Sequence, residues 1–212
     1  MMSEATKPSP SVEDKPVQKN RWTLIAIMVI SILPISAAYF MFFTGIGVPQ
    51  HTVNNGVLLT SAVNVKDLFE ADDHQIVRAV HDEKKWRLLI PVTEQCDKAC
   101  EDILYTTRQV HIRLGEKSER LERIAVNLAG LPGQQFIDGL VKDHPLLKSA
   151  SVTRAQWDRW LSQASATLDL NQQPYYLLVD QEGFAMMSYT TQHGNLLLED
   201  LKRALKYSID YQ

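Results

Sequence analysis

The longest uncharged segment of the chain constrains its architecture most. Residues 22–43 read WTLIAIMVISILPISAAYFMFF and carry no charged side chain. A helix of this length, at 1.5 Å per residue, extends about 33 Å and can cross a bilayer core about 30 Å thick. Trp22 at one end and a cluster of aromatic residues at the other match the positions of interfacial aromatic belts. A transmembrane helix is therefore predicted over 22–43.

A cleaved signal peptide is the main alternative for this segment. Ser36, Ala37 and Ala38 resemble a small-residue cleavage site. However, the apolar run exceeds the roughly 7–15 residues of a signal peptide core, and a polar segment precedes it. A buried core helix would rarely be so uniformly apolar. We therefore favour an uncleaved anchor.

Basic residues predict the direction in which the anchor crosses the membrane. Before the span lie Lys7, Lys15, Lys19 and Arg21, whereas the first basic residue after it is Lys66. The positive-inside rule places the N-terminus in the cytoplasm and everything after the span across the membrane. In a bacterium this corresponds to a single-pass inner-membrane protein with a periplasmic C-terminal domain.

The composition on either side of the span predicts the domain organisation. Residues 1–21 are rich in Ser, Pro, Lys and Glu and are predicted to form a disordered cytoplasmic tail. Residues 44–53 form a short linker, and residues 54–212 are long enough for one globular domain. The net charge of -3, without a dense basic block, argues against nucleic-acid binding.

Within 54–212, alternating apolar runs and helical periodicities predict an α/β domain. The expected order is strand, helix, strand, helix, two strands and a closing helix. This order implies a central sheet with helices on both faces. The segments are a strand at 86–92, a helix at 97–114, a strand at 123–128, a helix within 151–166, strands at 175–179 and 184–189, and a helix at 196–205.

The two cysteines of the chain lie where the first strong strand passes into its helix. Cys96 and Cys100 are four residues apart, so their sulfurs lie on one helix face. They can form a disulfide or share one soft metal ion. The helix N-terminus favours a thiolate, whereas the neighbouring acidic residues oppose it and favour a cation. A purely structural disulfide is the alternative, although so short a loop constrains the unfolded chain only slightly.

A strand followed by Cys96-Asp97-Lys98-Ala99-Cys100 at the start of a helix resembles the CxxxC variant of the thioredoxin fold. This variant is typical of the Sco family of cytochrome c oxidase assembly proteins, which also have an N-terminal anchor. Residues 173–183 resemble the Pro-led strand and Asp-x-x-Gly turn of TlpA-like thiol oxidoreductases. The resemblance covers residues 54–208 and implies a thioredoxin-like domain. It also implies that Pro174 is a cis-proline facing the two cysteines.

The sequence departs from the Sco pattern at the metal-binding histidine. Sco proteins have a histidine shortly before the strand that ends in the Asp-x-x-Gly turn, but residues 169–173 contain none. His193 is the candidate replacement, because the strand before it returns to the end of the sheet that carries the cysteines. For the metal-binding alternative, the predicted ligands of Cu(I) are Cys96 and Cys100, with a third ligand supplied by His193, a Met or the partner. No other cofactor is implied.

Other soft or nitrogen ligands are less suitable. His111 lies about 16 Å beyond Cys100 along the same helix and cannot reach the pair. In Met186-Met187, strand alternation places one side chain in the core and one outside, which indicates packing.

These features lead to three functional hypotheses. In the first, Cys96 attacks a disulfide of a client and Cys100 resolves the mixed disulfide, making the two cysteines and Pro174 the catalytic residues. The expected client is a respiratory oxidase subunit, in particular its copper-bearing subunit, or an assembly factor of the oxidase. In the second, the CxxxC pair carries Cu(I) as a metallochaperone. In the third, the domain is a non-catalytic assembly scaffold.

Overall fold

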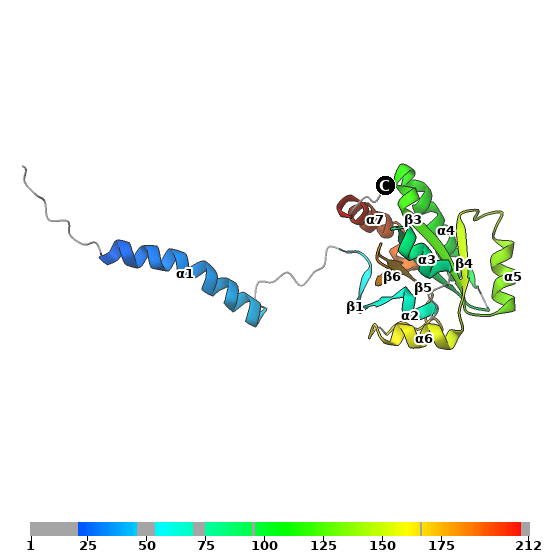
Figure 1. Cartoon of the computed structure of the whole chain (residues 1–212), viewed down its shortest axis with the longest axis horizontal. Coiled ribbons are helices and arrows are strands. Elements are labelled where there is room, and N and C mark those ends of the chain that lie inside the picture. Colours follow the sequence, from blue (N-terminus) through cyan, green and yellow to red (C-terminus); the bar gives the residue numbers. More distant parts are fainter. Residues whose placement is uncertain (1–20, 46–53, 70–74, 95, 166, 209–212) are drawn as a thin grey trace, which may run out of the picture. The chain divides into compact units, whose positions relative to one another are not determined.

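The computed structural model describes residues 21–45, 54–69, 75–94, 96–165 and 167–208, which are the coloured parts of Figure 1. The chain divides into two compact units, residues 1–52 and 53–212. The predicted cytoplasmic tail, apart from Arg21, lies outside the described residues. Most of the predicted linker at 44–53 does so too, and both assignments stay predictions.

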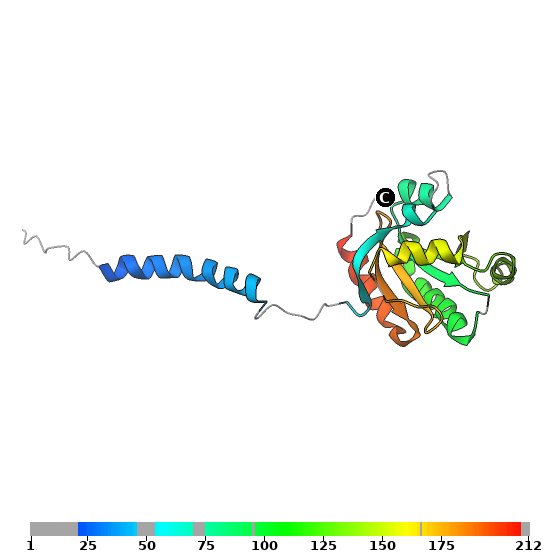
Figure 2. The same ribbon diagram turned by 90° about the horizontal axis from the view of Figure 1, so that it is seen from below.

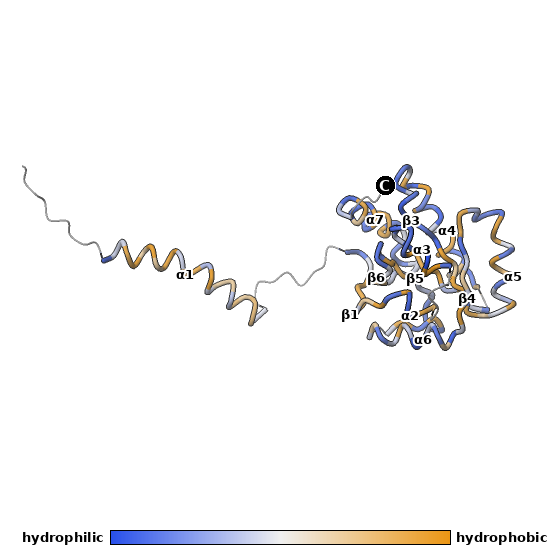
Figure 3. Tube along the Cα trace, in the orientation of Figure 1, coloured by the Kyte–Doolittle hydropathy of each residue, from blue (hydrophilic) through white to orange (hydrophobic). Residues whose placement is uncertain are grey.

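The first unit contains helix α1 (Arg21–Thr44), which confirms the helix predicted over 22–43. None of its residues is buried, and apolar residues extend along its length (Figure 3). Ser31 and Thr44 donate their hydroxyls to carbonyls one turn earlier, at 2.9 and 2.7 Å, so these polar groups are satisfied within the helix. Among the described residues, α1 is the one helix long and apolar enough to cross a membrane.

The second unit is built on a six-stranded mixed sheet with the order β1-β6-β5-β2-β3-β4. Strands β2, β3 and β4 are parallel, whereas β5 runs antiparallel to β2 and β6, and β1 runs antiparallel to β6. The strands are β1 (Val57–Asn64), β2 (Trp86–Val92), β3 (Leu121–Asn127), β4 (Leu147–Ser151), β5 (Tyr175–Val179) and β6 (Phe184–Thr190).

Helices cover both faces of this sheet (Figure 1 and Figure 2). Apolar side chains of α2 (Val65–Phe69), α3 (Gln75–Asp82) and α6 (Arg154–Ser162) form the core on one face. Those of α4 (Lys98–Arg113), α5 (Leu131–Gly139) and α7 (Leu196–Tyr207) pack on the other. Every residue of β2 and β3 is buried, as expected for strands covered on both sides.

Two short 3-10 helices complete the second unit. They are η1 (Gly115–Arg120), which joins α4 to β3, and η2 (Thr191–His193), which follows β6.

The predicted order of elements is confirmed, and the strands over 86–92 and 175–179 have the predicted bounds. The predicted elements did not include β1, α2, α3, α5 and β4. Strand β4 has a single buried residue, Ala150, and therefore lacks the apolar alternation that marks a half-buried strand. It adds a parallel edge strand to the sheet. The tertiary fold creates this strand by pairing it with β3.

The start of the second unit is fixed to α7 by a buried carboxylate. Oδ2 of Asp200 accepts the backbone N–H groups of Asn55 and Gly56 at 2.9 and 3.0 Å, and the Tyr189 hydroxyl at 2.9 Å. A Cβ at Gly56 would lie 2.4 Å from the Tyr189 ring, so only glycine fits there. Asn55 and Gly56 thus hold the beginning of β1 in place.

Candidate functional site

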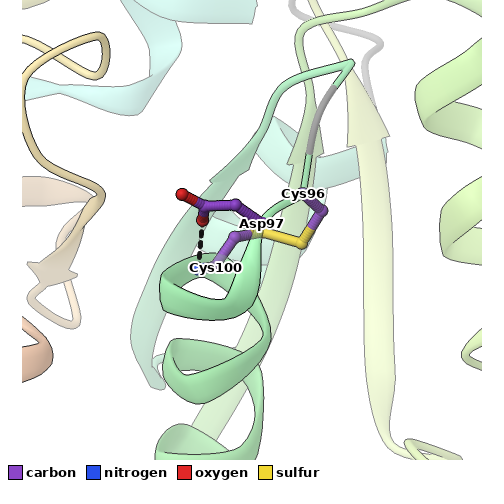
Figure 4. Close-up of a disulfide and its surroundings, with 3 residues drawn as sticks. All are labelled: Cys96, Asp97 and Cys100. Carbon is purple, nitrogen blue, oxygen red and sulfur yellow. Dashed lines mark hydrogen bonds between the residues drawn. A yellow bond between two sulfur atoms is a disulfide. The ribbon is translucent and has the colours of Figure 1, made fainter.

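Cys96 and Cys100 form a disulfide at the start of α4 (Figure 4). The S–S distance is 2.01 Å, the Cα atoms are 5.2 Å apart, and the dihedral angle about the S–S bond is -93°. Strand β2 and helix α4 position the pair, because the connection between them is only a few residues long. The structure therefore brings together the two residues that the CxxxC motif singled out.

Asp97 caps the helix that carries the disulfide. Its Oδ1 accepts the backbone N–H of Cys100 at 3.0 Å, the contact drawn as a dashed line in Figure 4. A capping carboxylate stabilises a helix start and complements its dipole. Asp97 therefore stabilises the start of α4, the helix that carries Cys100.

The two sulfur-bearing residues differ in accessibility. Cys96 is half-buried, whereas Cys100 is 7% exposed and packs in the core between α4 and the sheet. Thiol–disulfide exchange depends on which sulfur an incoming group can reach. The arrangement allows an outside thiol or disulfide to meet Cys96 first and leaves Cys100 for the internal step.

Pro174 lies beside the pair, as the sequence predicted. It lines a hollow of about 120 Å³ together with Cys100, Asp97 and Asn171. The prediction that it is a cis-proline was wrong, because no cis peptide bond occurs among the described residues. The trans form is the intrinsically favoured one. The turn before Pro174, in which Asp169 O accepts the N–H groups of residues 172 and 173 at 3.1 and 3.0 Å, leads into β5 without a cis bond.

A larger cleft of about 500 Å³ adjoins this hollow. It lies beyond the C-terminal ends of β2 and β3 and shares Asp97 and Asn171 with the hollow. Arg154, the first residue of α6, also lines the cleft and is paired with Asp158 at 2.9 Å. The sequence reading did not identify Arg154. The signal was present, because Thr153 and Gln156 form a capping box that fixes where α6 begins.

His193 is not brought to the cysteines. Its Nδ1 accepts the backbone N–H of Thr190 at 2.9 Å, and its ring contacts Tyr189. Asn195, two residues later, accepts a hydrogen bond from Arg113 at the last residue of α4, whereas the cysteines lie at the first turn. The helix has 16 residues and is about 24 Å long. Strand β6 does return to the end of the sheet that carries the cysteines. After β6, the chain leads away from the cysteines, and Asn195 contacts the last residue of α4.

The predicted group of Cys96, Cys100 and His193 is not formed within the described part of the chain. No group of three or more His, Cys, Asp or Glu side chains that could hold a metal ion occurs there. His111 is half-buried with Nε2 at 3.1 Å from Leu121 O, and Met187 is buried while Met186 is half-exposed, in agreement with the expected packing roles.

Comparison with known proteins identifies the family. Residues 86–208, from β2 through α7, match the family described as "Transmembrane-like, thioredoxin-like, C-terminal domain". The chain belongs to this family. The match covers more than half of the chain and includes both cysteines and Pro174. The thioredoxin-like fold that the CxxxC motif implied is thereby confirmed.

Several solved structures are similar to this chain. Yeast Sco1 is 13% identical with a TM-score of 0.47, and the similarity covers 59% of this chain and 83% of Sco1. A putative electron transfer protein from Aquifex aeolicus VF5 is 14% identical with a TM-score of 0.48, covering 74% and 96%. A thiol:disulfide interchange protein from Bacteroides sp. is 12% identical with a TM-score of 0.45, covering 73% and 92%. No curated protein matches the sequence.

Proposed function

We propose that the protein is a membrane-anchored thiol–disulfide protein whose Cys96–Cys100 pair exchanges with the disulfide of a client. The accessibility of the two cysteines carries this proposal: Cys96 is half-buried, whereas Cys100 is enclosed. A purely structural disulfide needs no such difference. Cys100 also lines the hollow, which adjoins the larger cleft, and together these spaces leave room for a client segment.

The exchange is a two-electron reduction of the client. The Cys96 thiolate attacks one sulfur of the client disulfide, forms a mixed disulfide and releases the other client sulfur as a thiolate. The Cys100 thiolate then attacks the Cys96 sulfur. This step forms the Cys96–Cys100 disulfide and releases the second client thiolate. A dithiol reductant must return the pair to the reduced state before the next cycle.

The orientation of the anchor determines where this chemistry occurs. With basic residues on the N-terminal side of α1, the positive-inside rule places the second unit in the periplasm of a bacterial inner membrane. Thiols there become oxidised unless a dedicated pathway keeps them reduced. A protein that reduces one particular client disulfide has a clear use in such a compartment.

We infer that the client is the copper-bearing subunit of a respiratory oxidase. The support is the CxxxC motif at a strand-to-helix junction together with an N-terminal anchor, a combination that resembles the Sco proteins. Copper-binding cysteines must be reduced before the metal enters, because the thiolate is the ligand. Reduction is favoured over copper carriage because His193 lies away from the pair and the described residues contain no group of three or more His, Cys, Asp or Glu side chains that could hold a metal ion.

Mixed-disulfide trapping in intact membranes tests both parts of the proposal. The full-length Cys100→Ser variant lacks the resolving thiol and should accumulate an adduct through Cys96. Mass spectrometry of the adduct should identify an oxidase subunit. The matched control is the Cys96→Ser/Cys100→Ser variant, which should form no adduct. A Cys100→Ser variant without a reducible adduct, or full copper loading of the oxidase in the double variant, would argue against the proposal.

A further inference from the structure

Arg123, at the centre of β3, is a buried cation without an anionic partner. It is 2% exposed, and no carboxylate within the described residues lies at ion-pair distance. Its Nε donates to Thr107 Oγ1 at 3.2 Å, and its Nη2 donates to Leu104 O at 2.8 Å. Nη2 also lies 3.3 Å from Nδ1 of His144. All these acceptors are neutral, and burying a charge without an opposite charge is costly.

The charge of Arg123 persists at neutral pH. Burial and the neighbouring charge of Arg108 lower the pKa of Arg123 to about 10, so the guanidinium stays protonated. Deprotonation therefore does not relieve the cost. An anion from outside the described chain would relieve it.

Two further basic residues surround Arg123. Arg108, on α4, makes no side-chain hydrogen bond or ion pair with any described residue, and its charge acts on both Arg123 and His144. His144, in the connection from α5 to β4, has its pKa lowered by burial and then by the two arginines. Asp143 raises the pKa of His144, and it is the one acidic residue among the causes of that shift. The cluster is thus strongly cationic.

Three donors of this cluster are available to a ligand. Nη1 of Arg123 has no hydrogen-bond partner among the described residues, and it is not one of the fully enclosed unpartnered atoms there, which are Trp86 Nε1 and Tyr176 OH. Nδ1 of His144 accepts from Arg123, which leaves the imidazole proton on Nε2. The Arg108 guanidinium is the third donor. These groups come from β3, the α5–β4 connection and α4.

We infer that Arg108, Arg123 and His144 form a binding site for a phosphate-type oxyanion. A phosphate group offers several oxygens in tetrahedral directions, which suits donors from three separate elements. A carboxylate normally pairs with arginine at two points. On Arg123 the edge formed by Nε and Nη2 is already occupied by Thr107 and Leu104.

Free phosphate and a phospholipid headgroup are the two sources of such a group. Helix α1 is long and apolar enough to cross a membrane, so a phospholipid headgroup is one anion that the chain can meet. Exposed apolar side chains also neighbour the cluster in the sequence. Tyr105 on α4 is 59% exposed, and Val141 and Leu146, on either side of His144, are 63% and 67% exposed.

The test uses the full-length protein in nanodiscs and follows the imidazole resonance of His144 by NMR. In phosphatidylcholine nanodiscs, inorganic phosphate is titrated against chloride at constant ionic strength. In a second arm, phosphate is omitted and phosphatidylglycerol replaces part of the phosphatidylcholine. A saturable shift in the first arm identifies phosphate, and a shift in the second identifies the headgroup. A lack of change in both arms overturns the inference.

Two variants complete the test. Arg108→Gln removes a half-buried donor without a protein partner, so the fold is preserved. The affinity for the anion, measured from the shift of the His144 resonance, should fall at least tenfold. Arg78→Gln is the matched control, because Arg78 is an exposed arginine on α3, on the opposite face of the sheet. It should respond as the wild type does. A full response in Arg108→Gln would also overturn the inference. The cysteines take no part, so the result does not depend on the proposed thiol chemistry.

Discussion

Two arginines are buried in adjacent strands of the sheet, and their charges are compensated in different ways. Arg87 on β2 is 0% exposed and Arg123 on β3 is 2% exposed. Arg87 donates Nε to Glu122 Oε2 at 3.0 Å and its other nitrogens to backbone carbonyls. Arg123 has only neutral partners. The same residue type is thus part of a complete ionic network on one face of the sheet and of an incomplete one on the other.

This difference separates a structural role from a binding role. A paired buried charge is explained by the fold, since removing one partner leaves the other uncompensated. An unpaired buried charge has no such explanation within the chain. Arg87 is therefore expected to matter for stability, and Arg123 for binding.

The largest effect is expected for Arg87→Met. This substitution leaves the carboxylate of Glu122, which is 7% exposed, with Lys148 as its one remaining cation. Breaking a buried ion pair typically costs about 3–5 kcal/mol of unfolding free energy. Denaturant unfolding of the full-length protein measures the change. A loss of well under 1 kcal/mol would mean that Lys148 compensates Glu122 alone.

A smaller loss is expected for Lys148→Met, which removes the other cation beside Glu122. The Lys148 side chain is 49% exposed, so solvent screens the pair. With Arg87 still in place, the unfolding free energy should fall by about 1 kcal/mol or less. The double variant with Arg87→Met should lose more than the sum of the two single losses, because Glu122 then has no cation.

Arg123→Met should leave the stability nearly unchanged or raise it by up to about 1 kcal/mol when no phosphate is present. The substitution removes an uncompensated charge from the core. Thr107 keeps its hydrogen bond to Ile103 O at 2.8 Å. The measurement is the same unfolding experiment in phosphate-free buffer. If Arg123→Met loses as much unfolding free energy as Arg87→Met does, neutral acceptors are enough to compensate the Arg123 guanidinium. The proposed difference between Arg87 and Arg123 would then be wrong.

The smallest effect concerns pH. Burial and the two arginines lower the pKa of folded His144 below the value of about 6.5 in the unfolded chain. The unfolded chain therefore binds a proton first, and stability is lost as the pH falls below about 6.5. His144→Gln should reduce this acid-side loss, as denaturant unfolding at pH 5 and pH 7 would measure. In Arg123→Met, NMR titration should show the pKa of His144 rising, and an unchanged pKa would rule out the coupling.

Local signals determined much of the fold. Uniform apolarity identified α1, and the run from β2 through the cysteines into α4 was readable because each element has its own periodicity and its own start signal. Strand β4 was not readable, because a sheet edge with one buried residue has no pattern before pairing. The position of β4 depends on its parallel pairing with β3.

The candidate site also combines a feature that the sequence predicted with features that only the tertiary structure determined. The four-residue spacing of Cys96 and Cys100 predicted that their sulfurs can meet, and they form a disulfide although Cys96 precedes the N-cap of α4. The difference in their exposure came from the packing of α4 on the sheet. The orientation of His193 away from the pair was likewise decided by the path of the chain after β6.

The ionic networks show this division most plainly. Glu122 and Arg123 are neighbours in the sequence and would be paired by a reading of the residues alone. Successive side chains of a strand point to opposite faces, however, so the carboxylate and the guanidinium are separated by the sheet itself. Glu122 instead meets Arg87, its direct neighbour on β2 and 35 positions away in the chain. The sequence supplied the charges, and the pairing of β2 with β3 decided which one remained without a partner.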